Sequence, residues 1–244
     1  MSRPPAPATV VTSPSPERRA ALPGAVVMLA VSNLMSNRVL PDALYVPWNL
    51  AMAAALGGLA WWAGLRPPEL GWQRWARGAR FGLVLAVLTL AVYLLALAMP
   101  AASKAFEDQR VDGGVGSLLL NTLVKIPLGT VLLEEIAFRS VLPALAARRW
   151  GIVRGSVFAS VLFGFWHVLP SMNITNVNPV LADLFGDGPF AGLLGVVFAV
   201  AGTTLAGLWF CWLRYWSGSV LAPMIGHFST NSLGYLFGWI VVSS

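Results

Sequence analysis

Charged residues are scarce in this chain, and their scarcity indicates its class. Only 11% of the 244 residues are Asp, Glu, Lys or Arg, while 57% are hydrophobic. An ordinary soluble domain carries about 25% charged residues. Several apolar runs approach the roughly 20 residues that a helix needs to cross a bilayer. The composition therefore argues against a soluble domain and predicts an all-α, polytopic transmembrane bundle in the plasma membrane, with about seven spans.

Cysteine and histidine are also nearly absent. The single cysteine, Cys211, lies in an apolar run, so it forms no internal disulfide and fits no cysteine-based metal motif. The chain has two histidines, and neither belongs to a His-Glu-x-x-His zinc motif. The sequence therefore offers no disulfide framework and no recognised zinc motif.

Basic residues outnumber acidic residues by 16 to 10, but they do not form one basic surface. They lie between apolar runs, as membrane topology requires, so the lipid bilayer is a predicted partner and nucleic acid is not.

Membrane proteins keep Lys and Arg mainly on the cytoplasmic side. With seven spans and an inner N-terminus, three bases fall outside (Arg38, Lys104, Arg110) and eleven inside: Arg3, Arg18, Arg19, Arg66, Arg74, Arg77, Arg80, Arg148, Arg149, Arg154 and Arg214. This bias predicts a cytoplasmic N-terminus and an external C-terminus.

The chain divides into three predicted regions. Residues 1–19 are rich in Pro, Ser, Thr and Ala, which predicts a disordered cytoplasmic tail. A cleaved signal peptide is the competing interpretation of this segment. Residues 20–114 are predicted to hold the N-terminal transmembrane helices, and residues 115–244 the spans with intramembrane polar groups. The run 115–147 is too long for one simple span, and its Pro127 lacks a backbone donor and can kink a helix.

Two adjacent acids interrupt that long run, in the sequence Leu-Leu-Glu-Glu-Ile-Ala-Phe-Arg at 132–139. Charges inside hydrocarbon are costly, so they have partners and usually a function. Glu135 and Arg139 are four residues apart on one helix face, with the acid on the favoured N-terminal side. Glu134 is rotated by about 100° from Glu135. We therefore expect Glu135 to pair with Arg139 as structural support, which leaves Glu134 free for chemistry.

The two histidines lie in later spans at a similar depth. Phe163 and His167 share one helix face, and His227 and Asn231 share another. Counted at about 1.5 Å per residue, Glu134, His167 and Asn231 lie roughly 20 Å from the cytoplasmic ends of their spans, and His227 about 13 Å. Three helices can thus bring these groups to one layer. A carboxylate and an imidazole can activate water, and two donors can stabilise an oxyanion.

The ordered motifs resemble the CPBP family, which comprises CAAX prenyl proteases and bacteriocin-processing enzymes. The matching patterns are Glu-Glu-x-x-x-Arg, Phe-x-x-x-His and His-x-x-x-Asn on three successive helices, within about residues 115–240. The resemblance implies an intramembrane endopeptidase whose catalytic core is residues 115–244. It also implies a membrane-anchored or lipidated protein or peptide as substrate.

The resemblance also implies a role for each matching residue. It makes Glu134 the general base for water, with His167 assisting it. It makes His227 and Asn231 the oxyanion hole. The remaining motif residues are implied to be structural supports: Glu135, Arg139 and Phe163.

The sequence leaves the cofactor and the function open. Two histidines and a glutamate would suit zinc, but asparagine is a poor zinc ligand, and we favour a glutamate-dependent mechanism without a metal or another cofactor. One alternative function is a proton-coupled transporter, in which intramembrane Glu, His and Lys125 form a relay. The other is a non-catalytic immunity or scaffold protein that keeps the motifs and acts by binding.

Overall fold

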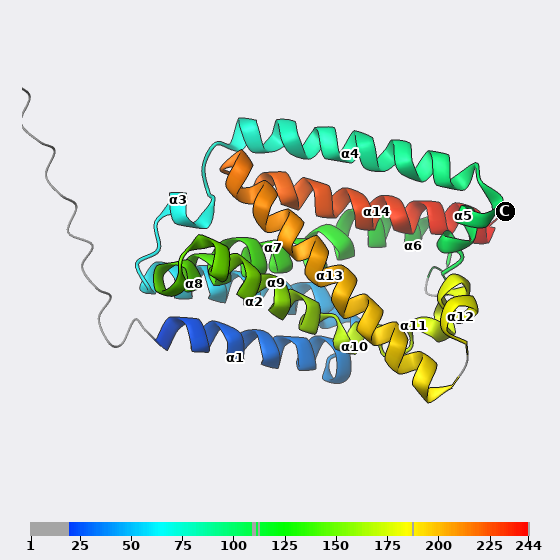
Figure 1. The fold of residues 1–244 in the computed structure, drawn as a ribbon, viewed down its shortest axis with the longest axis horizontal. Coiled ribbons are helices and arrows are strands. Elements are labelled where there is room, and N and C mark those ends of the chain that lie inside the picture. Colours follow the sequence, from blue (N-terminus) through cyan, green and yellow to red (C-terminus); the bar gives the residue numbers. More distant parts are fainter. Residues whose placement is uncertain (1–19, 109–110, 112, 187, 244) are drawn as a thin grey trace, which may run out of the picture.

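The described part of the chain is built from helices. The computed structural model describes residues 20–108, 111, 113–186 and 188–243, and these ranges contain no β-strand (Figure 1). The predicted all-α fold class is therefore confirmed. The segment predicted to be a disordered tail, 1–19, lies outside the described residues.

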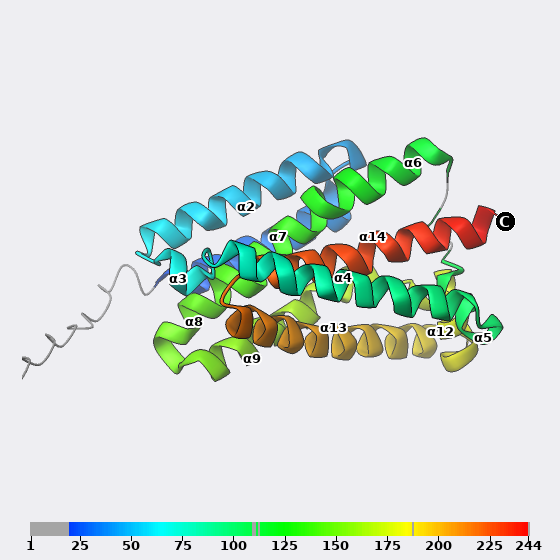
Figure 2. The same ribbon diagram turned by 90° about the horizontal axis from the view of Figure 1, so that it is seen from above.

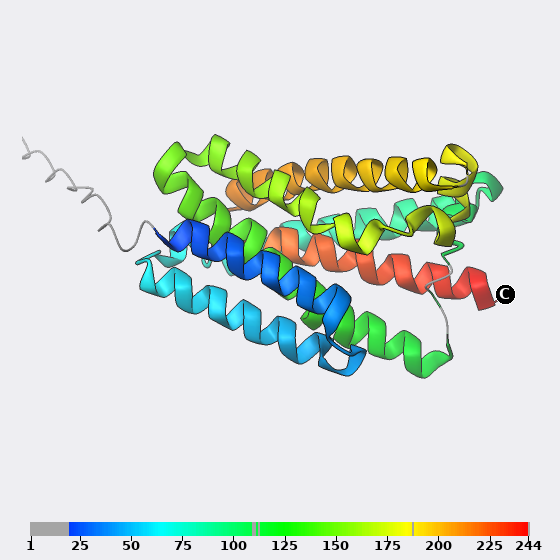
Figure 3. The same cartoon turned by 90° about the horizontal axis from the view of Figure 1, so that it is seen from below.

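The N-terminal helices divide between two sides of the bundle. Figure 1 shows α4 along the top and α1 along the bottom, with α7 and α14 between them. Figure 3 shows α2 beside α1. These helices and their short connecting turns are α1 (Ala21–Leu34), a π-helical turn (Met35–Val39), a 3-10 turn (Asp42–Leu44), α2 (Tyr45–Trp62), α3 (Pro67–Leu70), α4 (Trp75–Leu97), α5 (Pro100–Ser103) and a 3-10 turn (Lys104–Phe106).

One long helix, Val115–Trp150, carries the acidic pair through the bundle (Figure 2). It contains α6 (Val115–Leu120), α7 (Leu132–Glu135) and α8 (Leu142–Trp150), joined by two stretches with π-type hydrogen bonding, Asn121–Val131 and Ile136–Val141. Pro127 lies in the first stretch, and the Leu132 N–H bonds the Pro127 carbonyl five residues back. Widened turns of this kind often occur at functional sites. The acidic pair therefore occupies a single α-helical turn between two widened stretches.

Side chains of α2 hold the first widened stretch in place. Asn49 is buried and donates from Nδ2 to the carbonyl oxygen of Gly129 at 2.7 Å. Tyr45 Oη lies 3.0 Å from Thr130 Oγ1. A Cβ on Gly129 would come within 2.9 Å of the Tyr45 ring, so glycine permits this close approach. These contacts fix the backbone one turn before Glu134.

The C-terminal helices complete the bundle and bring both histidines to it. Glycines allow α4 and α14 to run side by side, because a Cβ on Gly82 would lie 2.6 Å from the Cβ of Ile225, and one on Gly226 would overlap Leu85. Small residues are the usual packing device between membrane helices. The helices of this region are α9 (Ile152–Trp166), α10 (Val168–Ser171), α11 (Ile174–Val177), α12 (Pro179–Phe185), α13 (Pro189–Ser217) and α14 (Leu221–Ser243).

Four helices of the described residues are long and apolar enough to cross a membrane: Asp42–Trp62, Pro67–Leu97, Val115–Trp150 and Pro189–Ser217. The predicted total of seven spans is not confirmed. α9 has 15 residues, fewer than the roughly 20 that cross the hydrocarbon core. α1 continues directly into the π-helical turn Met35–Val39, which contains Ser36, Asn37 and Arg38 and therefore lowers the hydropathy of that helix. α14 has 23 residues but contains a histidine and several Ser, Thr and Asn residues, which reduce its hydropathy.

Candidate active site

The carboxyl group of Glu134 points into the bundle, and its two oxygens have different surroundings. Glu134 is 4% exposed. Its Oε1 accepts a hydrogen bond of 2.9 Å from the indole Nε1 of Trp166 on α9. Its Oε2 lies 3.7 Å from Nε2 of His227 on α14 and has no hydrogen-bond partner among the described residues. Buried carboxylate oxygens normally accept a hydrogen bond, so Oε2 is the atom through which Glu134 can still act.

Glu135 contacts His227 as well as Arg139. Its Oε1 lies 2.8 Å from His227 Nδ1 and 3.4 Å from Arg139 Nη1. The expected pairing with Arg139 is therefore present, although the contact with the histidine is shorter and was not predicted. A carboxylate only accepts hydrogen bonds, so Nδ1 is the nitrogen that carries the proton. This leaves Nε2 directed toward Glu134 Oε2.

Arg139 is held between aromatic rings rather than by hydrogen bonds. Its side chain is fully buried, and apart from the ion pair with Glu135 none of its guanidinium nitrogens makes a hydrogen bond to a described residue. Its guanidinium carbon lies 3.9 Å from the centre of the Phe163 ring and 5.2 Å from that of Phe210. Phe210 also stacks on His227, with ring centres 5.6 Å apart. Cation–π contacts strengthen when desolvated, and Phe163 thus serves as a platform for Arg139.

His167 lies at the edge of this cluster. It directly follows α9, is half-buried, and has its Nδ1 2.8 Å from the carbonyl oxygen of Phe163. Its ring packs edge-on against the Phe163 ring, with centres 4.6 Å apart. Among the described residues, no hydrogen bond joins His167 to Glu134. Because the carbonyl oxygen can only accept, Nδ1 carries the proton and Nε2 is the nitrogen able to accept one.

Asn231 lies one turn of α14 beyond His227 and is exposed. It lines a cavity of about 810 Å³ formed by residues of α4, α5, α12 and α14, elements that converge at the right of Figure 1. Tyr93, Thr230 and Tyr235 line the same cavity. Four residues of helix rise by about 6 Å, so the cavity begins close to the buried cluster. The structure therefore gathers Glu134, Glu135, Arg139 and His227, and leaves Asn231 at a cavity wall.

The structure adds Trp166 to the site, a residue that the sequence did not single out. Tryptophans of membrane proteins concentrate at the membrane–water interface, yet Trp166 is only 9% exposed. A buried indole N–H usually needs an acceptor, and Glu134 supplies one. The one available signal was the position of Trp166 directly before His167 in an apolar helix.

Glutamate and histidine side chains are common zinc ligands, and the site contains both. Among the described residues, no three His, Cys, Asp or Glu side chains gather in an arrangement that could hold a metal ion. The Glu135 oxygen nearest to His227 already bonds its Nδ1. The expected mechanism without a metal or another cofactor stays a prediction.

Comparison with known proteins shows which family part of this chain resembles. Residues 116–233 match the family model for Type II CAAX prenyl endopeptidase Rce1-like proteins. No curated protein and no solved structure matched the chain. The matched segment begins within α6 and ends within α14, so it contains the acidic pair and both histidines. The match confirms the predicted resemblance to the CAAX prenyl protease family over residues 116–233. Together with the four apolar helices, it indicates an integral membrane protein.

Proposed function

We propose that the chain cleaves a peptide bond of a membrane-anchored or lipidated protein, with Glu134 as general base for water. The family implies a CAAX-type endopeptidase. The observation that carries the proposed mechanism is the asymmetry of Glu134. One of its oxygens is held by Trp166, while the other has no partner among the described residues and lies 3.7 Å from His227 Nε2. A fixed carboxylate beside an imidazole suits general acid–base catalysis.

In this mechanism water attacks the carbonyl carbon of the scissile bond and gives its proton to Glu134. Negative charge develops on the carbonyl oxygen, and a protonated His227 donates to it from Nε2. Glu135 stabilises that imidazolium through Nδ1, at 2.8 Å. Preorganised donors aimed at a developing oxyanion are usually the largest catalytic contribution. Glu134 then returns the proton to the leaving amine as the carbon–nitrogen bond breaks.

The proposal keeps the roles expected for the two outer residues. Asn231 shares the His227 face of α14 and supplies a second donor to the oxyanion from the cavity wall. His167 assists Glu134 with its Nε2, which remains an acceptor because Nδ1 faces the Phe163 carbonyl oxygen. Phe163 supports both His167 and Arg139 through ring contacts.

The function is tested directly by comparing the termini of membrane proteins in cells that contain the chain and in cells that lack it. Hydrolysis predicts new protein termini near membrane anchors only where the chain is present. Unchanged termini together with proton-coupled flux in vesicles would favour the transporter alternative. Unchanged termini without flux would favour a protein that acts by binding.

The proposed mechanism uses no metal. We expect a chelator to leave the cleavage rate of a farnesylated peptide by the purified chain within twofold of the untreated rate. Glu134, His227 and their neighbours would perform every proton transfer without a Lewis acid. A rate that falls with chelator and returns with added zinc would replace this mechanism by a metal-dependent one.

Trp166 is proposed to position the Glu134 carboxylate. Trp166→Phe keeps an aromatic ring but removes the donor to Oε1. A hydrogen bond to a charged group contributes about 1.5–3 kcal/mol, so kcat should fall roughly 10-fold or more. KM should change less than twofold, because the lost hydrogen bond orients the carboxylate that acts on water.

The matched control for this variant is Trp61→Phe, because Trp61 is 83% exposed at the end of α2. Its kcat and KM should equal those of the wild type. A Trp166→Phe enzyme with a raised KM and an unchanged kcat would show that the indole contributes to substrate binding instead.

A further inference from the structure

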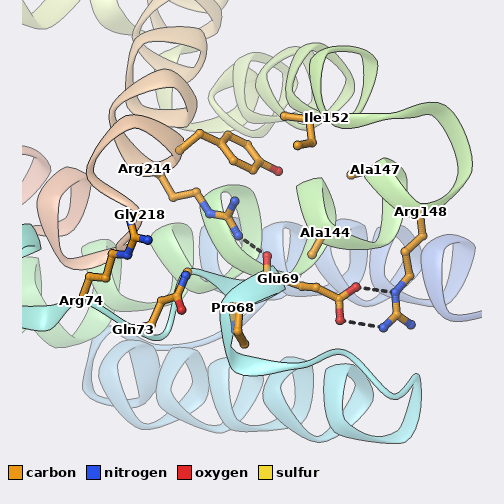
Figure 4. A pocket seen from close by; sticks show the side chains of 12 residues that line it. Pro68, Glu69, Gln73, Arg74, Ala144, Ala147, Arg148, Ile152, Arg214 and Gly218 are labelled. Atoms are coloured by element: carbon orange, nitrogen blue, oxygen red, sulfur yellow. Dashed lines mark hydrogen bonds and ion pairs between the residues drawn. The ribbon is translucent and has the colours of Figure 1, made fainter. Parts of the chain in front are cut away.

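Another cavity, of about 500 Å³, lies between α3, α8 and the end of α13, away from Asn231 (Figure 4). Its lining includes three arginines, Arg74, Arg148 and Arg214, and one carboxylate, Glu69. The charge of the lining is therefore +2, from three positive groups and one negative group. The proposed hydrolysis uses none of these residues.

The single carboxylate is fully engaged by one of the three arginines. Arg148 binds Glu69 through two contacts, Nε to Oε1 at 2.7 Å and Nη2 to Oε2 at 2.8 Å. Glu69 Oε2 also accepts from the backbone N–H of Arg66 at 2.8 Å. Arg148 further donates to the carbonyl oxygens of Ala63 and Gly64. Figure 4 shows this pair at one side of the cavity, so Glu69 neutralises Arg148 alone.

Arg214 brings a buried charge to the cavity without a carboxylate partner. It is 3% exposed, and among the described residues no carboxylate lies within ion-pair distance of it. Its Nη2 donates to the backbone carbonyl oxygen of Glu69, while its Nε has no hydrogen-bond partner. Its guanidinium carbon lies 4.0 Å from the centre of the Tyr215 ring. A buried charge without a counter-charge is costly, so this guanidinium fits an anionic ligand.

Arg74 brings a second unneutralised guanidinium to the same cavity. Its guanidinium group makes no hydrogen bond or ion pair with a described residue. The stem of the Arg74 side chain lies over Gly218, where an added Cβ would meet Arg74 Cδ at 2.9 Å. Gly218 has φ of 72°, a conformation that favours glycine. Figure 4 shows Arg74 and Arg214 approaching the cavity from two different elements. Two guanidinium groups that line one cavity offer several charged donors to the oxygens of a phosphate group.

We propose that this cavity binds the phosphate headgroup of an anionic phospholipid. An exposed tryptophan lies within two positions along the sequence of each of the three cavity arginines: Trp75, Trp150 and Trp216. Tryptophans concentrate at membrane–water interfaces, which places the cavity at headgroup level. Basic pockets between membrane helices on the cytoplasmic side are suited to anionic headgroups. The membrane setting favours a lipid over free phosphate as the source of the anion.

A headgroup in this cavity would connect the helices that carry the candidate active site. α8 continues the helix of Glu134, and Gly218 lies between α13 and α14, which carries His227. A phosphate bound by Arg74 and Arg214 would tie these elements together at one end of the bundle. Binding to the folded state alone stabilises it in proportion to ligand concentration. The proposal thus predicts stabilisation by anionic lipid, whether or not the chain cleaves peptides.

The test titrates phosphatidylglycerol into the purified full chain in neutral detergent with phosphatidylcholine, and measures the thermal midpoint. We expect phosphatidylglycerol to raise the midpoint saturably and inorganic phosphate to leave it unchanged. Arg74→Gln should weaken the apparent affinity about fivefold, the effect of about 1 kcal/mol for one basic residue near a lipid surface. Arg80→Gln removes the same charge from an exposed position of α4 outside the cavity and should have no effect.

Arg214→Gln should weaken the affinity for phosphatidylglycerol more than Arg74→Gln does. Arg214 is buried and its substitution can prevent folding, so the test depends on the exposed Arg74 in that case. An equal loss of lipid affinity in Arg74→Gln and Arg80→Gln would contradict the proposed site, because it would indicate that the lipid is attracted to positive charge anywhere on this surface. An equal shift with inorganic phosphate would overturn the lipid assignment. An unchanged midpoint with both ligands would overturn the proposal entirely.

Discussion

Glu134→Gln is expected to lower kcat for peptide hydrolysis by about 10²–10⁴-fold, the usual contribution of a general base. The amide has almost the same shape as the carboxyl group, and its oxygen can still accept from Trp166 at the position of Oε1. The amide nitrogen cannot take a proton from water at the position of Oε2. We therefore expect the variant to fold normally and to bind substrate, and the loss to appear in kcat measured with a farnesylated peptide.

Asp42→Asn is the matched control, because it makes the same carboxyl-to-amide change on a side chain that is 98% exposed. This variant should retain the wild-type rate. Thermal midpoints of both variants should equal that of the wild type, which separates chemistry from folding. A folded Glu134→Gln chain that cleaves at the wild-type rate would contradict the proposed general base.

Part of the site could be predicted because it depends on neighbours along one helix. Four-residue spacing correctly predicted that Glu135 and Arg139 meet, since helix geometry alone determines that contact. The contact between Glu135 and His227 joins residues 92 positions apart. It depends on how α14 packs, and α14 packs closely because of glycines such as Gly82 whose partner helix the sequence does not reveal.

Trp166 and His167 have surroundings that depth alone does not predict. Counting depth placed Glu134 and His167 in one layer, but depth gives no rotation about the helix axis. In the structure Trp166, one residue earlier, faces Glu134, and His167 turns toward the carbonyl of Phe163. One residue rotates a helical side chain by about 100°. The direction in which each side chain points therefore depends on how the helices pack, which the sequence does not reveal. The all-α class, in contrast, could be predicted from composition alone.

Glu135→Leu is expected to lower the free energy of unfolding by about 3–5 kcal/mol, because it leaves the buried charge of Arg139 uncompensated. Both side chains are fully buried, and the guanidinium nitrogens have no hydrogen bond to a described residue that could replace the lost carboxylate. His227 Nδ1 would lose its acceptor as well. The measurement is equilibrium unfolding in mixed detergent micelles, monitored by tryptophan fluorescence.

Adding Arg139→Met to Glu135→Leu should restore most of that stability. Replacing a buried ion pair by apolar residues of similar volume is often neutral or stabilising, and methionine packs well against rings such as Phe163. Activity should not return, because His227 would still lack the carboxylate that orients its imidazole.

A double variant that is stable but inactive would assign Glu135 two separable roles, one in balancing Arg139 and one in holding His227. A double variant as unstable as Glu135→Leu alone would contradict the pairing, and a double variant with wild-type activity would contradict the role of Glu135 at the histidine.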